Sequence, residues 1–104
     1  MTGNVRTDFS QACNTGALDI IKREWSEEIL EAAGVPNEMM PKPVDSTSVV
    51  GEVTDIASSQ SGLYKGTPVV MGGGDVACAA AGAGAVTEGV SYVCLGSAAW
   101  MGFF

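Results

Sequence analysis

The fold is decided by the stretch Gly66-Thr67-Pro68-Val69-Val70-Met71-Gly72-Gly73-Gly74-Asp75-Val76-Ala77-Cys78, which continues through small residues to Val86. Its residues 68 to 71 form a short apolar run rich in β-branched side chains, which is typical of a strand. Three glycines then break the run, and nothing in residues 77 to 85 opposes a closely packed helix. The stretch therefore predicts a strand, a tight turn and a helix, with one carboxylate, Asp75, at the turn.

Asp75 has two interpretations. Its side chain either accepts the first N–H groups of the helix, as an N-cap residue does, or projects into the crevice at the carboxyl end of the strand. The glycines at 72 to 74 favour the second interpretation, because they let another molecule approach the backbone closely and a simple cap does not need them.

Length and charge exclude several classes of protein. A chain of 104 residues is one domain at most and can bury only a modest core on its own. It carries 5 basic and 12 acidic residues, a net charge of -7, with no cluster of lysine or arginine. We therefore expect neither nucleic acid nor a membrane as a partner, and an anionic ligand would be held by backbone N–H groups or a metal.

The cysteines Cys13, Cys78 and Cys94 are odd in number and widely spaced, and the chain has no histidine. This pattern argues against a zinc site and against a disulfide scaffold. We expect three free thiols, with Cys78 and Cys94 inaccessible in the full protein. The first residues also lack the apolar run of a signal peptide, so the expected location is the cytoplasm.

Helices are predicted near residues 26 to 33, 55 to 63 and 76 to 85. In the first, Ser26 caps the helix, Trp25 lies on its apolar face and Gly34 ends it. In the second, Asp55 caps the helix. The side chains expected to point inward from this second helix are Ile56, Ser59 and Leu63. Residues 7 to 16 predict a loop or a short irregular helix, and residues 35 to 43, with three of the prolines, predict a connector.

Strands are predicted near residues 49 to 54, with a bulge at Gly51, near 68 to 72 and near 90 to 95. A hairpin turn is expected at Gly96-Ser97, because the apolar pattern resumes after it. This tip either presents successive N–H groups and one hydroxyl to an anion or is a plain turn. The last residues, 103 and 104, form an apolar strand edge that a natural domain seldom exposes, so we expect a fragment of a longer protein.

The glycine turn resembles one nucleotide-binding motif and lacks the residues of another. Gly72-x-Gly74-x-x-Ala77 matches the dinucleotide fingerprint after a strand and before a helix. The charge of Asp75 would oppose a pyrophosphate there, and no acidic ribose ligand follows the next strand closely. A P-loop is excluded because no Gly-Lys-Ser/Thr follows.

Several segments together resemble the FGGY family of carbohydrate kinases, xylulose kinases in particular. The residues that carry the resemblance are 66 to 77, the glycine-rich segment 81 to 86, and Leu95-Gly96-Ser97-Ala98-Ala99-Trp100, supported by residues 7 to 10, 18 to 20, 23 to 26 and 49 to 54. The similarity covers nearly the whole chain, and the chain covers only the middle of such a kinase.

The resemblance implies an α/β, ribonuclease H-like fold of the actin-like ATPase type. Residues 1–88 would be the C-terminal part of the N-terminal domain, and residues 89–104 the opening hairpin of the C-terminal domain. Asp75 would be the catalytic base, Asp75 and Val76 would contact the sugar, and Gly96, Ser97 and Ala98 would contact the nucleotide phosphates. The implied partners are a small sugar and ATP with Mg, no metal ligand is expected among these residues, and a homodimer is compatible with the family.

The resemblance implies that the parent protein is a kinase phosphorylating xylulose or a related pentulose or polyol, and that the piece alone is inactive. Two other classes stay open: a fragment of a dinucleotide-binding oxidoreductase, and a non-catalytic actin-like scaffold, which would not need a carboxylate at position 75.

Overall fold

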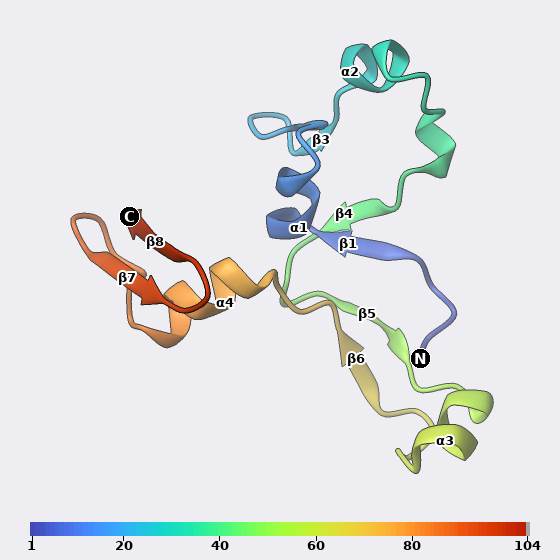
Figure 1. Ribbon diagram of the computed structural model, residues 1–104. Helices are drawn as coiled ribbons and strands as arrows, with labels where there is room; N and C mark the ends of the chain where they lie inside the picture. Colours follow the sequence, from blue (N-terminus) through green and yellow to red (C-terminus); the bar gives the residue numbers. More distant parts are fainter. Residues whose placement is uncertain (104) are drawn as a thin grey trace. The chain divides into compact units, whose positions relative to one another are not determined.

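Short helices and strands alternate along the chain in the computed structural model, which describes residues 1–103 (Figure 1). The elements are β1 (Arg6–Asp8), α1 (Phe9–Asn14), β2 (Leu18–Asp19), β3 (Glu24–Trp25), α2 (Glu27–Ala32), the 3-10 helix η1 (Asn37–Met39), β4 (Lys42–Val44), β5 (Val49–Glu52), α3 (Asp55–Ser61), β6 (Pro68–Val70), α4 (Asp75–Gly82), β7 (Ser91–Leu95) and β8 (Ala99–Phe103). The predicted mixture of helix and strand is confirmed.

Contacts divide the chain into two compact units, Met1–Gly73 and Gly74–Phe104. The first contains every element from β1 to β6, and the second contains α4, β7 and β8. The division falls within the glycine turn, between Gly73 and Gly74. The predicted domain boundary at residues 88 and 89 stays a prediction.

Three pairs of strands organise the first unit. β1 and β4 are parallel, β2 and β3 form an antiparallel hairpin, and β5 and β6 are antiparallel. The register of β5 shifts between Val49 and Gly51, which confirms the predicted glycine bulge. Gly51 has a φ of 150° and lies against Thr2, whose Cβ would be 2.8 Å from a Cβ added at position 51. Only glycine fits this bulge.

The short helix predicted as one alternative for residues 7 to 16 is present, but two strands in the segments predicted to be irregular were missed. Residues 6 to 8 and 42 to 44 form the parallel pair β1 and β4, and residues 9 to 14 form α1. Asp8 is 2% exposed and caps α1, accepting hydrogen bonds from the N–H groups of Ser10 at 2.9 Å and Gln11 at 3.4 Å, as well as from the Ser10 hydroxyl. Asp8, which lies in a segment that looks like a polar loop in the sequence, is therefore a buried carboxylate that accepts three hydrogen bonds.

Helix α2 follows its prediction and α3 departs from it. Ser26 caps α2 and Gly34, with a φ of 68°, follows its end, as predicted, although Trp25 belongs to β3 rather than to the helix. In α3 the cap is Thr54, whose hydroxyl accepts the N–H of Ala57 at 3.2 Å, and not Asp55.

The predicted inward face of α3 is also wrong. Ile56 is 70% exposed, Leu63 is 43% exposed, and Ser59 is exposed as well. The helix has no buried residue, because no other element of the first unit packs against it closely enough to cover an apolar stripe. Regularly spaced positions such as Ile56 and Leu63 indicate a helix but do not supply the partner that buries them.

In the second unit, β7 and β8 pair as an antiparallel hairpin from Ser91 opposite Phe103 to Leu95 opposite Ala99. The turn lies at residues 96 to 98, which confirms the predicted hairpin. Both strands alternate between exposed and half-buried positions. The half-buried face carries Tyr92, Cys94, Trp100 and Gly102. The register therefore places these four residues together.

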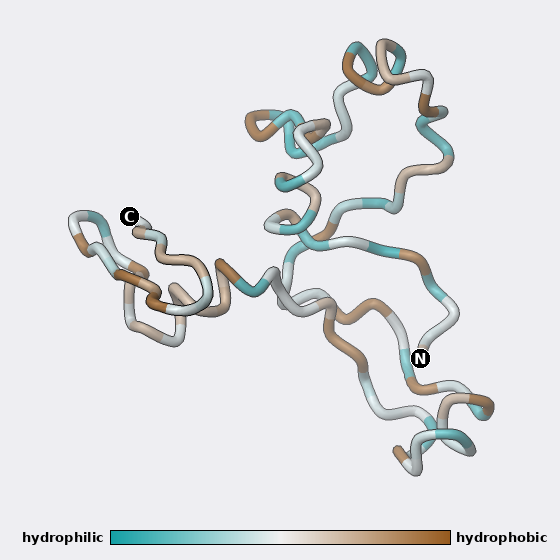
Figure 2. Tube along the Cα trace, viewed as in Figure 1, coloured by the Kyte–Doolittle hydropathy of each residue, from teal (hydrophilic) through white to brown (hydrophobic). Residues whose placement is uncertain are grey.

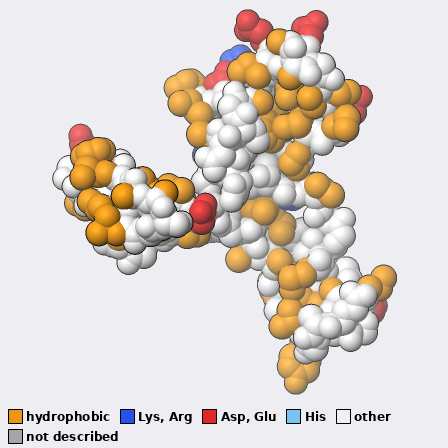
Figure 3. Space-filling view, viewed as in Figure 1, with side chains coloured by type: hydrophobic (Ala, Val, Ile, Leu, Met, Phe, Trp, Pro, Cys, Tyr) orange, Lys and Arg blue, Asp and Glu red, His pale blue; other side chains and the backbone are white. Residues whose placement is uncertain are grey.

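Hydrophobic residues occur along both units (Figure 2), and hydrophobic side chains reach the surface in both (Figure 3). On the hairpin, Val93, Leu95, Met101 and Phe103 are all more than half exposed. Among residues 1–103, no helix has the length and apolar composition needed to cross a bilayer. All three cysteines are free thiols, as predicted, with Cys13 and Cys78 exposed in this chain and Cys94 half-buried. The burial of Cys78 and Cys94 in the full protein stays a prediction.

Candidate functional site

The two predicted parts of the site lie in the same compact unit. Asp75 is the first residue of α4, and Gly96, Ser97 and Ala98 form the turn between β7 and β8. In Figure 1 the helix lies beside the hairpin, in agreement with a hydrogen bond between them described below. The carboxylate and the turn are therefore built on one local framework.

The glycines set the direction in which α4 begins. Gly72 has a φ of 78°, which a side chain would make unfavourable, and Gly74 occupies the N-cap position in an extended conformation. Gly74 is also buried. The chain thus enters the helix through residues without side chains, and Asp75 is the first side chain after the turn.

The interpretation of Asp75 as the N-cap is wrong. The cap position belongs to Gly74, and within residues 1–103 no side-chain hydrogen bond caps α4. The Asp75 side chain is exposed and has no hydrogen-bond or ion-pair partner among those residues. A capping aspartate has a different geometry, as Asp8 demonstrates on α1. Asp75 is therefore a free carboxylate at a helix N-terminus, where the helix dipole favours its negative charge.

Val76 follows Asp75 and contributes its backbone as well as its side chain. The side chain is 49% exposed. The carbonyl oxygen accepts a hydrogen bond from the Tyr92 hydroxyl at 3.3 Å. This bond joins the first turn of α4 to β7.

The turn at residues 96 to 98 has unused donors. The N–H of Gly96 donates to the carbonyl of Ala98 at 3.2 Å, which closes the turn. Among residues 1–103, the N–H groups of Ser97 and Ala98 and the Ser97 hydroxyl have no partner, and all three residues of the turn are exposed. Such a turn can donate hydrogen bonds to an anion.

The arrangement can perform two chemical tasks. A free carboxylate can accept a proton from a hydroxyl group, and exposed N–H and O–H donors can bind phosphate oxygens. In the described part of the chain, no three carboxylate, thiol or imidazole groups gather as a metal site. The sequence singled out Asp75, Val76 and the turn, and the structure brings them into one unit; their functional roles stay predictions.

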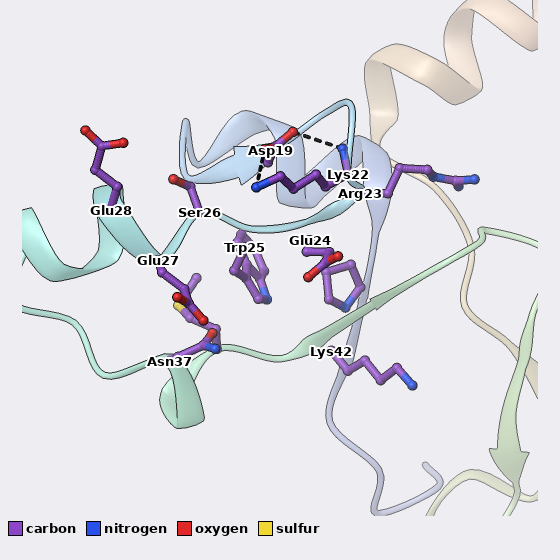
Figure 4. Close-up of a pocket in the computed structure, with 12 residues that line it drawn as sticks. Asp19, Lys22, Arg23, Glu24, Trp25, Ser26, Glu27, Glu28, Asn37 and Lys42 are labelled. Carbon is purple, nitrogen blue, oxygen red and sulfur yellow. Dashed lines mark hydrogen bonds and ion pairs between the residues drawn. The ribbon is translucent and has the colours of Figure 1, made fainter.

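A hollow in the first unit lies between β3, α2 and β4 (Figure 4). It has a volume of about 830 Å³, and its walls carry charges of both signs around Trp25, whose Nε1 donates to the carbonyl of Pro41 at 2.8 Å. The pKa of Asp19 on its rim is lowered, mainly by the hydrogen bond from the Lys22 N–H. No predicted site residue lines this hollow, so it does not belong to the candidate site.

Sequence reasoning missed Tyr92. The residue lies opposite Gly102 in the hairpin, and a Cβ at position 102 would be 2.4 Å from the ring atom Cε1. The signal in the sequence that could have identified Tyr92 is an aromatic residue opposite a glycine on paired strands. This signal can be used only when the register of the β7/β8 hairpin is known.

Comparisons with known proteins agree on one family. Residues 1–82 match the model described as the FGGY family of carbohydrate kinases, N-terminal domain. An autoinducer-2 kinase of Enterobacter sp. (strain 638) is 42% identical over 100 residues, covering 96% of this chain and 19% of that protein. One from Klebsiella pneumoniae subsp. pneumoniae is 41% identical with the same coverage.

A solved structure of a xyloylose kinase from Brucella ovis is similar in both sequence and fold. It has a TM-score of 0.86 and 31% identity, over 97% of this chain and 21% of that chain. The present chain therefore spans 19% of the length of the curated relatives it matches.

Proposed function

Because the chain belongs to the FGGY family of carbohydrate kinases, we propose that it is part of an ATP-dependent kinase that phosphorylates a hydroxyl of a small sugar. The family resemblance drawn from the sequence is thereby confirmed. The observation that carries the proposal is the free, exposed carboxylate of Asp75 at the start of α4, in the same unit as a turn with free donors.

Asp75 is the general base in this proposal. The sugar hydroxyl transfers its proton to the carboxylate as its oxygen bonds to the γ-phosphorus of ATP. The bond from that phosphorus to the bridging oxygen breaks, and ADP leaves with that oxygen. A carboxylate already occupied by cap hydrogen bonds, as in Asp8, would be a poorer acceptor. Val76 lies beside the sugar, and its exposed side chain offers an apolar contact.

Gly96, Ser97 and Ala98 bind the terminal phosphates of ATP. The two free N–H groups and the Ser97 hydroxyl match the acceptor oxygens of a phosphate, and Gly96 keeps the turn closed. Magnesium is the metal implied by the family. Residues 1–103 do not fit a metal site on their own, so the ion would be carried by the phosphates, whose charge it neutralises.

The rest of the proposal concerns the whole protein. The fold is ribonuclease H-like, with residues 1–88 in the first domain and residues 89–104 opening the second, and the sugar and ATP meet between the domains. The enzyme is cytoplasmic and a homodimer is compatible with it. The substrate is xylulose or a related pentulose or polyol, with autoinducer-2 as the substrate suggested by the names of the most similar relatives given above.

Sugar-dependent consumption of ATP by the longer protein that contains this chain tests the proposal. Purified protein is incubated with ATP and magnesium, with xylulose, autoinducer-2 or no acceptor, and both ADP and phosphorylated acceptor are measured. We expect one acceptor to raise ADP formation and to appear as a phosphate ester in equal amount. If none of the acceptors changes the rate of ADP formation, this result contradicts a sugar kinase and favours the non-catalytic actin-like scaffold.

A further inference from the structure

We propose that Tyr92 is a positioning residue, which holds the helix that carries Asp75 and the turn at residues 96 to 98 in a fixed relation to each other. This inference rests on the proposed function for its catalytic consequence. Its structural basis is the set of contacts that the Tyr92 ring and hydroxyl make within the second unit.

The ring of Tyr92 crosses onto the opposite strand of the hairpin. Tyr92 pairs with Gly102, and a Cβ at position 102 would lie 2.4 Å from Cε1, 2.9 Å from Cζ and 3.1 Å from the hydroxyl oxygen. The phenolic end of the ring therefore occupies the space that a side chain at position 102 would fill. A side chain at position 102 would therefore displace the ring, and no positive φ is involved.

Trp100 fixes the ring from one side. The two ring centroids are 5.1 Å apart with an interplanar angle of 86°, an edge-to-face contact. Trp100 and Gly102 lie on the same face of β8, because residues two apart on a strand point the same way. The ring of Tyr92 is thus held over Gly102 by packing, which leaves its hydroxyl at one defined place.

That hydroxyl reaches the helix that carries Asp75. It donates to the carbonyl of Val76 at 3.3 Å, which is longer than the usual range of about 2.5–3.0 Å for a hydroxyl donor. The packing of the ring therefore supplies most of the positioning, and the hydrogen bond adds a smaller part. The pKa of Tyr92 is raised by desolvation and by the nearby Cys94 thiol, so the hydroxyl keeps its proton at neutral pH.

The same residue lies on the strand that leads to the phosphate turn. Gly96 is four residues beyond Tyr92, about 13 Å along an extended strand. Tyr92 therefore links Val76, the residue next to the proposed base, to the turn that is proposed to contact the phosphates. Phosphoryl transfer depends on the alignment of these two groups, and a displacement of about 1 Å lowers rates by roughly 10²-fold.

The test uses two variants of the full-length kinase that perturb Tyr92 differently. Tyr92→Phe keeps the ring and removes the hydroxyl, whereas Gly102→Ala keeps Tyr92 and displaces its ring. The matched control is Tyr64→Phe, because Tyr64 is 88% exposed and its hydroxyl has no partner within residues 1–103. Rates are expressed per folded molecule, with kcat and the KM of sugar and ATP measured separately.

We expect kcat to fall about two- to tenfold in Tyr92→Phe and roughly tenfold or more in Gly102→Ala, with both KM values within about twofold of wild type. The ratio of ADP released to phosphorylated sugar formed rises in Gly102→Ala, because water competes at a misaligned site, and stays at one in Tyr64→Phe. Wild-type kcat in both variants, or losses that disappear when rates are expressed per folded molecule, would overturn the inference.

The Asp75→Asn variant separates this inference from the proposed function. If Asp75→Asn is inactive and both Tyr92 perturbations are silent, only the positioning role fails. If Asp75→Asn retains full turnover, the proposed role of Asp75 as the base fails, and amide hydrogen exchange over residues 75 to 82 still tests the structural part. Faster exchange in Gly102→Ala than in Tyr64→Phe supports the Tyr92 contact, and equal exchange contradicts it.

Discussion

Replacing Asp8 by alanine should destabilise α1 selectively. The side chain is 2% exposed and accepts hydrogen bonds from two backbone N–H groups and one hydroxyl at the start of the helix. Loss of an N-cap costs about 0.5–2 kcal/mol, and losing the further hydrogen bond from the Ser10 hydroxyl to the carboxylate adds about 1.5–3 kcal/mol. We therefore expect a loss of roughly 2–4 kcal/mol in the local free energy of opening, a middle estimate from these two terms.

Hydrogen exchange of the full-length protein measures this loss where it occurs. Because about 1.4 kcal/mol changes an equilibrium tenfold, amides of residues 9 to 14 should exchange at least about 30-fold faster in Asp8→Ala. Amides of residues 55 to 61 serve as the internal reference. The matched control is Asp55→Ala, whose side chain is 77% exposed and pairs with Lys65 at 2.9 Å, a surface ion pair with an expected contribution below about 1 kcal/mol.

The charge of Asp8 also predicts a dependence on pH. Burial alone would raise its pKa, but the hydrogen bonds from the Ser10 side chain and from the N–H groups of Ser10 and Gln11 outweigh burial and hold the pKa below its ordinary value of 3.8. A lowered pKa in the folded state stabilises the protein above the ordinary value, and this contribution disappears as the pH falls through the folded pKa. The stability difference between wild type and Asp8→Asn should therefore shrink below about pH 3.8. Exchange of α1 in Asp8→Ala that matches Asp55→Ala would refute the capping role.

Three further predictions follow from single contacts. Gly51→Ala should lower the unfolding midpoint by an amount equivalent to roughly 1–3 kcal/mol. Thr2→Gly should restore part of this loss, because the new Cβ would meet the Thr2 Cβ at 2.8 Å, while the strain of a side chain at a φ of 150° remains; no recovery in the double variant would exclude that clash as a cause. Ser97→Ala should raise the KM for ATP or lower kcat about tenfold while Ser97→Thr stays near wild type, and equal kinetics of both variants would remove the hydroxyl from the site. A thiol reagent should find three free thiols in the unfolded, unreduced protein, with Cys78 and Cys94 protected in the native full-length enzyme; rapid native labelling of either would contradict that protection.

The elements predicted well from sequence are those with strong local signals. The β-branched run at residues 68 to 70, the three glycines after it and the alanine-rich segment 75 to 82 each determine their structure within a few residues. Ser26 and Gly34 likewise bound α2 through local hydrogen bonds and a positive φ. These features needed no knowledge of distant parts of the chain.

The elements that were missed depend on partners far away in sequence. β1 and β4 are three residues each, and Thr7 pairs with Pro43 across 35 intervening residues. A proline weakens any strand prediction, because it lacks an N–H to donate. Only the parallel pairing makes these residues a sheet, and that pairing cannot be seen in either segment alone.

In the candidate site, too, some residues could be identified from local sequence and others required the structure. Asp75 and the turn at residues 96 to 98 were identified from local composition and from family resemblance. The capping alternative for Asp75 was excluded only by the structure, because Asp and Gly are both acceptable caps and the choice between neighbours depends on backbone geometry. The role of Tyr92 required the hairpin register as well.

Turnover of the Asp75→Asn variant of the full-length kinase is the most direct test of the central claim. Asparagine preserves the shape of the side chain but cannot take the proton of the sugar hydroxyl, so we expect sugar and ATP to bind as in wild type while kcat falls roughly 10²–10⁴-fold. Asp55→Asn is the matched control, since Asp55 is likewise exposed at the first position of a helix, and its kcat should equal that of wild type. An Asp75→Asn enzyme that turns over sugar at the wild-type rate would show that this carboxylate is not the base and would contradict the proposed mechanism.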